Sequence, residues 1–210
     1  MIATVLFSDL KGYTSAAEKL EPRALMDWVN SYLEAMAQVI IEHGGVIDDY
    51  AGDGIKANFG VPLPRSTDLE ISQDAVNAVR CALAMEQGLR RLNERWGAQD
   101  LPTVGMRIGI GTGPVVAGSL GSSQRMKYTT VGDTVNFAAR LESLDKDQVA
   151  PTGQAAQYRI LIDETTLRYL GGQFETQLIG EVSLKGKERP LITYRILGQV
   201  GDPAPGRDPA

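Results

Sequence analysis

The sequence is poor in cysteine and histidine. Its 210 residues include one of each, Cys81 and His43. A single thiol cannot form an internal disulfide, so a disulfide framework is excluded and a reducing compartment is favoured. His43 stands at a predicted helix end before two glycines, where it can favour the helix dipole. We therefore expect it to have no metal or acid–base role.

Long apolar runs and an excess of positive charge are also missing. No run reaches the length of a membrane-spanning helix. The 21 Lys and Arg residues are outnumbered by 26 Asp and Glu residues, and the net charge is −5. No global field therefore draws the chain to nucleic acid or to an anionic membrane, and a phosphate-bearing substrate would need a local cluster of cations. A nucleic-acid-binding module is disfavoured for the same reason, since no basic face is evident.

What is present is the composition of one well-cored domain, with 43% hydrophobic and 22% charged residues. The apolar pattern predicts the order β-α-β-β-α-β, followed by further strands. This order favours an α+β fold, a ferredoxin-like βαββαβ sandwich with extra C-terminal strands and with helices on one face of the sheet. We expect residues 1–198 to form this domain. Residues 199–210, rich in Pro, Gly and Asp, are predicted to be a disordered tail.

Two aspartates stand where predicted strands meet loops. Asp9 closes the strand that begins at Ile2, and Asp53 lies in the turn of the following hairpin. Strands of such a unit are commonly neighbours in the sheet, so the two carboxylates can converge as oxygen ligands for a divalent cation. The loop Ser8–Thr14 carries a glycine, and its backbone N–H groups could face a phosphate. Asp is also a common turn residue, so each aspartate alone leaves a purely structural role open.

Five segments, in this order, resemble the motifs of class III adenylate and guanylate cyclases. They are Phe7–Thr14 and Tyr50–Gly54 (metal binding), Met106–Gly113 (the next strand), Val131–Leu141 (the transition-state helix) and Leu184–Lys187 (a phosphate-binding lysine). The likeness runs in register from about residue 2 to residue 197. It implies an enzyme, a phosphorus–oxygen lyase that converts a purine nucleoside triphosphate to the 3′,5′-cyclic nucleotide and pyrophosphate.

The resemblance also assigns roles at the metal and at the reacting phosphorus. Asp9 and Asp53, with the carbonyl of Leu10, would hold two divalent cations, Mg²⁺ or Mn²⁺. Asn136 would orient the ribose and Arg140 would stabilise the crowded phosphorus. These last two residues are four apart on a predicted helix and so share a face.

The triphosphate would be held by two cations and by the glycine loop. Arg107 and Lys185 match the family's triphosphate contacts, beside the loop residues Gly12, Tyr13 and Thr14. Each site of the family is assembled from two subunits. The metal aspartates come from one chain, and the residues matching Asn136, Arg140 and Lys185, with the base-selecting residues, come from the other. Because this chain carries both sets, we expect a head-to-tail homodimer with two equivalent sites. The family is often fused to sensor or membrane segments, and its catalytic domain is expected to be cytoplasmic.

The positions that select the base depart from the adenylate cyclase pattern. Where adenylate cyclases usually carry lysine this chain has Asp49, and the partner position is Thr129. A carboxylate can accept from guanine N1 and N2, and a threonine hydroxyl can donate to O6 or accept from adenine N6. This pair slightly favours GTP over ATP. Aspartate is shorter than the glutamate that guanylate cyclases commonly use here, so an adenylate cyclase with a non-standard base pocket stays open.

Two other readings of the fold are weaker. A catalytically inactive nucleotide-binding domain would not need Asp9, Asp53, Asn136 and Arg140 together. A diguanylate cyclase requires two glycines followed directly by an acidic pair, whereas Val46 and Ile47 follow the glycine pair here.

Overall fold

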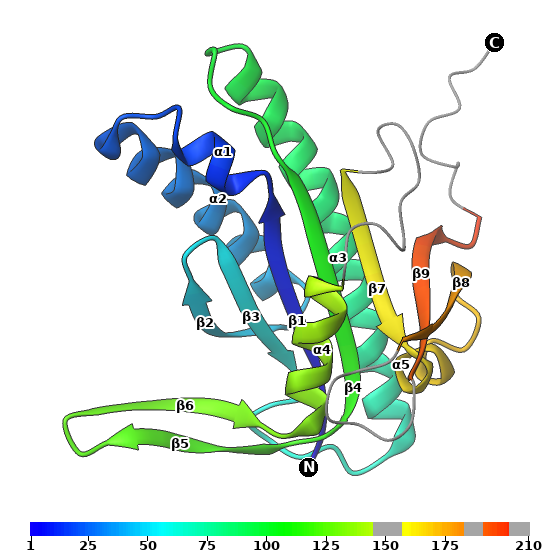
Figure 1. The fold of residues 1–210 in the computed structure, drawn as a ribbon. Coiled ribbons are helices and arrows are strands. Elements are labelled where there is room, and N and C mark those ends of the chain that lie inside the picture. Colours follow the sequence, from blue (N-terminus) through cyan, green and yellow to red (C-terminus); the bar gives the residue numbers. More distant parts are fainter. Residues whose placement is uncertain (145–156, 183–190, 202–210) are drawn as a thin grey trace.

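The centre of the structure is one seven-stranded sheet (Figure 1). Its strands carry four of the residues singled out above: Asp9, Leu10, Asp49 and Arg107. The computed structural model describes residues 1–144, 157–182 and 191–201. The sheet has the strand order β2-β3-β1-β4-β7-β9-β8, and a separate two-stranded sheet pairs β5 with β6. All neighbouring strands are antiparallel except β4 and β7, which are parallel. The elements, in order, are β1 (Ile2–Lys11), α1 (Tyr13–Ala17), α2 (Pro22–Glu42), β2 (Val46–Ala51), β3 (Gly54–Phe59), α3 (Asp68–Gly97), β4 (Gly105–Pro114), β5 (Val116–Ser122), β6 (Arg125–Val131), α4 (Asp133–Ser143), β7 (Tyr158–Asp163), α5 (Glu164–Tyr169), β8 (Phe174–Val182) and β9 (Leu191–Gln199).

The main core lies between the sheet and helices α2 and α3. Alternate residues of a strand point to the same face, so Leu6, Phe59 and Ile108 project together from β1, β3 and β4. They are buried with Tyr32 and Met36, which recur four residues apart on α2. This apolar layer fixes the positions of β1 and β4. Asp9 and Arg107 lie on the opposite face of these two strands.

Helix α4 covers the opposite face, on β1 and β4, as Figure 1 shows. Gly109, Gly111 and Gly113 alternate along β4, so this stretch of the strand has no side chains on the face that α4 covers. A Cβ added at Gly109 would lie 2.3 Å from the carbonyl oxygen of Ala138 and 2.3 Å from the amide nitrogen of Glu142. Only glycine therefore allows α4 to approach this closely, and the approach brings Glu142 over the sheet beside Arg107.

The hairpin of β5 and β6 extends away from the main sheet (Figure 1). Its strands stay paired from Val116 opposite Val131 to Ser122 opposite Arg125. Several of its apolar side chains are exposed: Val116, Leu120, Met126, Tyr128 and Val131. The root of the hairpin, at Thr129 and Thr130, is buried against the β2–β3 pair.

The predicted α+β fold with its βαββαβ order and added C-terminal strands is confirmed. Three details differ. Strand β1 continues to Lys11, so Asp9 lies within a strand. Helix α4 packs on the face of the sheet opposite α2 and α3, whereas all helices were expected on one face. The predicted tail overlaps β9, which reaches Gln199, and its residues 202–210 lie outside the described residues. Within the described ranges, no helix is long and apolar enough to span a membrane.

Candidate active site

Asp9 and Asp53 converge at one end of the β1–β3 pair. The backbone N–H of Leu10 donates to Asp53 Oδ2 at 3.1 Å, which fixes the turn between β2 and β3 against β1. Asp53 is buried, and burial together with the negative charge of Asp9 raises its pKa to about 6. The two carboxylates thus share a site in which their charges repel, an arrangement that a bound cation would relieve.

Arg107 connects this carboxylate pair to α4. It lies directly opposite Asp9 in the β1–β4 register, and its Nη2 is 2.5 Å from Asp9 Oδ2. Its Nε is 3.3 Å from Glu142 Oε1. Burial and the charge of Asp9 raise the pKa of Glu142 to about 7, although Arg107 and Arg159 act in the opposite direction.

Glu142 was missed from the sequence. The signal available for it was the alternation of glycines on β4, because that row lets α4 lie against the strand. Helical spacing then places Glu142, four residues after Ala138, on the side of α4 that touches Gly109.

A cavity of about 280 Å³ opens beside the carboxylates. Its lining residues are Asp9, Leu10, Gly12, Tyr13, Thr14, Ser15, Asp53 and Arg107. Gly12 has φ 94°, a left-handed conformation that favours glycine, and it leads directly into α1. The Tyr13 ring stacks on Trp28 with ring centroids 6.3 Å apart, so its side chain anchors the loop. The cavity thus joins acidic ligands, a cation and a glycine loop.

The donor set in this cavity fits a hard divalent cation. Carboxylate oxygens and a backbone carbonyl are the ligands that Mg²⁺ and Mn²⁺ prefer. No group of three His, Cys, Asp or Glu side chains with metal-binding spacing occurs in the ranges that the structure describes. Asp9 and Asp53 would therefore depend on the Leu10 carbonyl, substrate phosphates and water for the remaining ligands.

Asn136 and Arg140 lie on α4, away from its buried face. That face consists of Thr134, Val135, Phe137, Ala138 and Leu141. Asn136 is exposed and Arg140 is half-buried. Among the described residues, the lining of the carboxylate cavity includes neither Asn136 nor Arg140. The phosphate-binding lysine of the predicted site, Lys185, lies outside the described residues.

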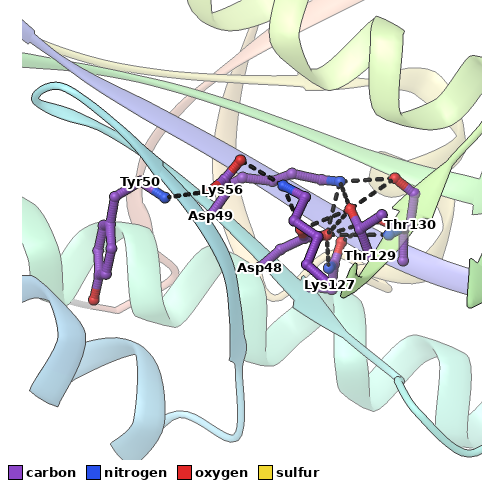
Figure 2. Close-up of polar contacts among 8 residues, drawn as sticks. Asp48, Asp49, Tyr50, Lys56, Lys127, Thr129 and Thr130 are labelled. Atoms are coloured by element: carbon purple, nitrogen blue, oxygen red, sulfur yellow. Dashed lines mark hydrogen bonds and ion pairs between the residues drawn. The ribbon is translucent and has the colours of Figure 1, made fainter. Parts of the chain in front are cut away.

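The predicted base-selecting residues meet in a polar cluster between β2, β3 and β6 (Figure 2). Its centre is Asp48, whose side chain is 1% exposed. Lys56 Nζ lies 2.7 Å from Asp48 Oδ2, and the Thr129 hydroxyl donates to Asp48 Oδ1 at 2.7 Å. Burial alone would raise the pKa of Asp48, but hydrogen bonds from Lys56, Thr129, Asn58 and the Thr130 amide lower it to about 2. Neither Asp48 nor Lys56 was singled out from the sequence.

Asp49 lies at the edge of this cluster. Lys127 Nζ is 2.5 Å from Asp49 Oδ2, and the hydrogen bond from Lys127 lowers the pKa of Asp49. The Asp49 side chain is 53% exposed. The carboxylate is therefore ionised, oriented and accessible. Asp49 and Lys56 also line a second cavity, of about 250 Å³, which continues to Asp9 and Glu142.

Comparison with known proteins identifies the family to which the chain belongs. Residues 2–198 match the family described as the adenylate and guanylate cyclase catalytic domain. The adenylate cyclase of Anabaena cylindrica is 36% identical over 202 residues, which cover 92% of this chain and 36% of that protein. The chain thus spans about a third of the length of this relative.

Two solved structures share the fold across nearly their whole length. The adenylyl cyclase CyaB from P. aeruginosa superimposes with a TM-score of 0.83 at 33% identity, covering 97% of both chains. The guanylyl cyclase Cya2 superimposes with a TM-score of 0.80 at 36% identity, covering 95% of this chain and 93% of that chain. Relatives of both base specificities are thus comparably similar. The chain belongs to the adenylate and guanylate cyclase catalytic domain family, the class III nucleotide cyclases, which are lyases.

Proposed function

We propose that the chain cyclises a purine nucleoside triphosphate at a site in which Asp9 and Asp53 hold two divalent cations. One observation carries this proposal: two converging carboxylates share a cavity with Arg107 and the Gly12 loop. When bound, the cations supply Lewis-acid activation of the 3′-hydroxyl and charge neutralisation at the triphosphate. The 3′ oxygen forms a bond to the α-phosphorus, its proton leaves, and the bond from the α-phosphorus to the leaving pyrophosphate breaks.

The protein groups bind and orient the substrate. Arg107 would hold the triphosphate once substrate and cations engage Asp9. Gly12, Tyr13 and Thr14 line the same cavity, and their backbone N–H groups would add contacts to phosphate. By the family pattern Lys185 adds a further cation. Asn136 orients the ribose, and Arg140 stabilises the negative charge that develops on the phosphorus, as a well-placed arginine does in other phosphoryl-transfer sites.

The site is completed by a second copy of the chain. Asn136 projects from the exposed side of α4 and does not line the cavity of its own Asp9 and Asp53. A head-to-tail homodimer would bring Asn136 and Arg140 of one protomer to the aspartates of the other, twice. The exposed apolar side chains of the β5–β6 hairpin are consistent with burial in such an assembly.

We propose that GTP is favoured over ATP. Guanine presents two donors, N1–H and N2–H, that can fork onto one carboxylate, and Asp49 offers an ionised and accessible one. Adenine presents an acceptor at N1, which the carboxylate would repel. A hydrogen bond to a charged group contributes about 1.5–3 kcal/mol, which is enough for a clear preference. ATP is the alternative substrate, with the base reoriented in the pocket.

The test is parallel turnover of GTP and ATP with Mg²⁺ or Mn²⁺, at a protein concentration that favours the dimer. The proposal expects metal-dependent cyclic GMP in excess of cyclic AMP, and loss of both products in Asp53→Asn. An excess of cyclic AMP would support the cyclase function and contradict the proposed preference for GTP. No cyclic product from a demonstrated dimer would favour a nucleotide-binding regulatory domain. We further propose that the domain works in the cytoplasm as part of a longer protein with a sensor or membrane segment.

A further inference from the structure

Lys56 brings a cation into the base-selecting cluster from a neighbouring strand. In the β2–β3 register its direct partner is Asp49. Directly opposed residues of an antiparallel pair project to the same face, and both residues line the 250 Å³ cavity. The Lys56 side chain is only 11% exposed. A lysine is therefore present at this site, although position 49 itself holds an aspartate.

The hydrogen bonds of Thr129 leave it unsuited to donate to a base. Its hydroxyl has one hydrogen, and the nearest acceptors of that hydrogen are the oxygens of Asp48, at 2.7 and 2.9 Å. Lys56 has three hydrogens, directed to Asp48 Oδ2 at 2.7 Å, the Thr130 carbonyl at 2.7 Å and Thr129 Oγ1 at 3.1 Å (Figure 2). The longest of these can be exchanged at least cost, because Thr129 keeps its bond to Asp48.

We propose that Lys56 is a specificity-determining residue that donates to O6 of guanine, while Asp49 accepts from N1–H and N2–H. Asp48 and Thr129 then act as positioning residues for the ammonium group. The inference rests on the proposed function, since it concerns the base of the same substrate. In the same orientation adenine would present an amino donor to Lys56 and a lone pair to Asp49, so both contacts would be repulsive.

A purely structural role for Lys56 makes a different prediction. As the counterion of buried Asp48, Lys56 would support the cluster for either base, and its loss would lower the turnover of GTP and ATP alike. Removing one member of a buried ion pair also leaves the other charge unpaired. The double substitution Asp48→Asn with Lys56→Met removes both charges and keeps side chains of similar size.

The experiment compares kcat/KM for GTP and ATP in the full chain, with circular dichroism as the check on folding. Lys56→Met and the double variant should lower the GTP/ATP ratio of kcat/KM by about 10- to 100-fold. Lys19→Met, at an exposed position outside the cavities, should leave the ratio unchanged. An unchanged ratio in the folded Lys56 variants would overturn the proposal. A rise in the ratio would overturn it too, because Lys56 would then be reading adenine N1.

A substrate analogue tests the same contact without a mutation. 6-Thioguanosine triphosphate keeps the N1 and N2 donors but has a weakly accepting sulfur in place of O6. The unaltered protein should use it less efficiently than GTP, and equal use would contradict the O6 contact. If the unaltered protein makes no cyclic product, the proposed function fails separately. Isothermal titration of GTP and ATP then tests Lys56 alone: Lys56→Met must weaken GTP binding more than ATP binding, and equal losses would overturn the assignment.

Discussion

Arg107 and Asp9 face each other across β1 and β4, with the guanidinium Nη2 2.5 Å from the carboxylate Oδ2. The same guanidinium group also reaches Glu142. A cation bound at Asp9 must therefore share that carboxylate with Arg107 or displace it. In the proposed cycle the triphosphate resolves this competition, because it offers Arg107 a new anionic partner.

Neutralising Arg107 should change metal and nucleotide binding in opposite directions. In Arg107→Met, Mn²⁺ alone should bind about 2- to 5-fold more tightly, since a partly exposed competing ion pair of up to about 1 kcal/mol is removed. GTP should bind more weakly, because a triphosphate contact is lost. Calorimetric titration with Mn²⁺, and separately with GTP, measures the two affinities. Arg23→Met, at an exposed position of α2, serves as the control. If both ligands weakened together, Arg107 would not compete with the cation.

Gly109→Ala should destabilise the fold and also reduce activity. The added Cβ would meet the backbone of α4 at Ala138 and Glu142, so the helix must shift. Overpacking of this kind costs about 1–3 kcal/mol. Denaturant unfolding measures the loss, with Gly97→Ala as a matched control, because a Cβ at Gly97 meets no atom within 4 Å. Equal stability of the two variants would show that α4 can adjust freely.

The buried carboxylate of Asp48 should make the free energy of unfolding depend on pH in the acid range. Its folded pKa of about 2 lies below the ordinary aspartate value of 3.8. Its contribution, on the order of 2 kcal/mol, is therefore fully present above about pH 4 and is lost as the pH falls through about 2. Unfolding free energies of the unaltered protein and of Asp48→Asn should converge over this range. Asp27→Asn, at an exposed position, serves as the control. A difference between Asp48→Asn and the unaltered protein that stays constant over this range would contradict the lowered pKa of Asp48.

Cys81 should resist thiol reagents in the native state. Burial raises the pKa of its thiol to about 12, so almost no thiolate exists at pH 8. A thiol-reactive disulfide reagent should label Cys81 in the folded protein only as fast as the structure around Cys81 opens. After unfolding in guanidinium chloride, the same reagent should label Cys81 fully. Rapid stoichiometric labelling of folded protein at pH 8 would show that α3 opens locally.

The fold and the carboxylate pair could be predicted because their signals are local. The apolar, β-prone run Ile2–Phe7, the helical spacing after Pro22 and the hairpin turn at Gly52-Asp53 are each visible in a few neighbouring residues. The structure brings Asp9 and Asp53 together through the β1–β3 pairing that this order of elements implies.

The parts that escaped prediction depend on long-range register. Glu142 reaches Arg107 only because a glycine row lets α4 approach β4. Lys56 meets Thr129 because the root of the β5–β6 hairpin docks on β3, a contact between residues 73 positions apart. Position 49 drew attention because of its place in a motif, while the lysine seven residues later had no motif to mark it.

Complementation between two inactive variants tests the shared site most directly. Asp53→Ala lacks a metal ligand and Arg140→Ala lacks the phosphorus contact, so each alone should be inactive. Mixed dimers contain one site with both defects and one intact site. Random exchange of equal amounts should therefore restore about one quarter of the unaltered activity, measured as cyclic nucleotide formed from GTP. No product from proven mixed dimers, under conditions where the unaltered protein is active, would contradict a site assembled from two copies of the chain.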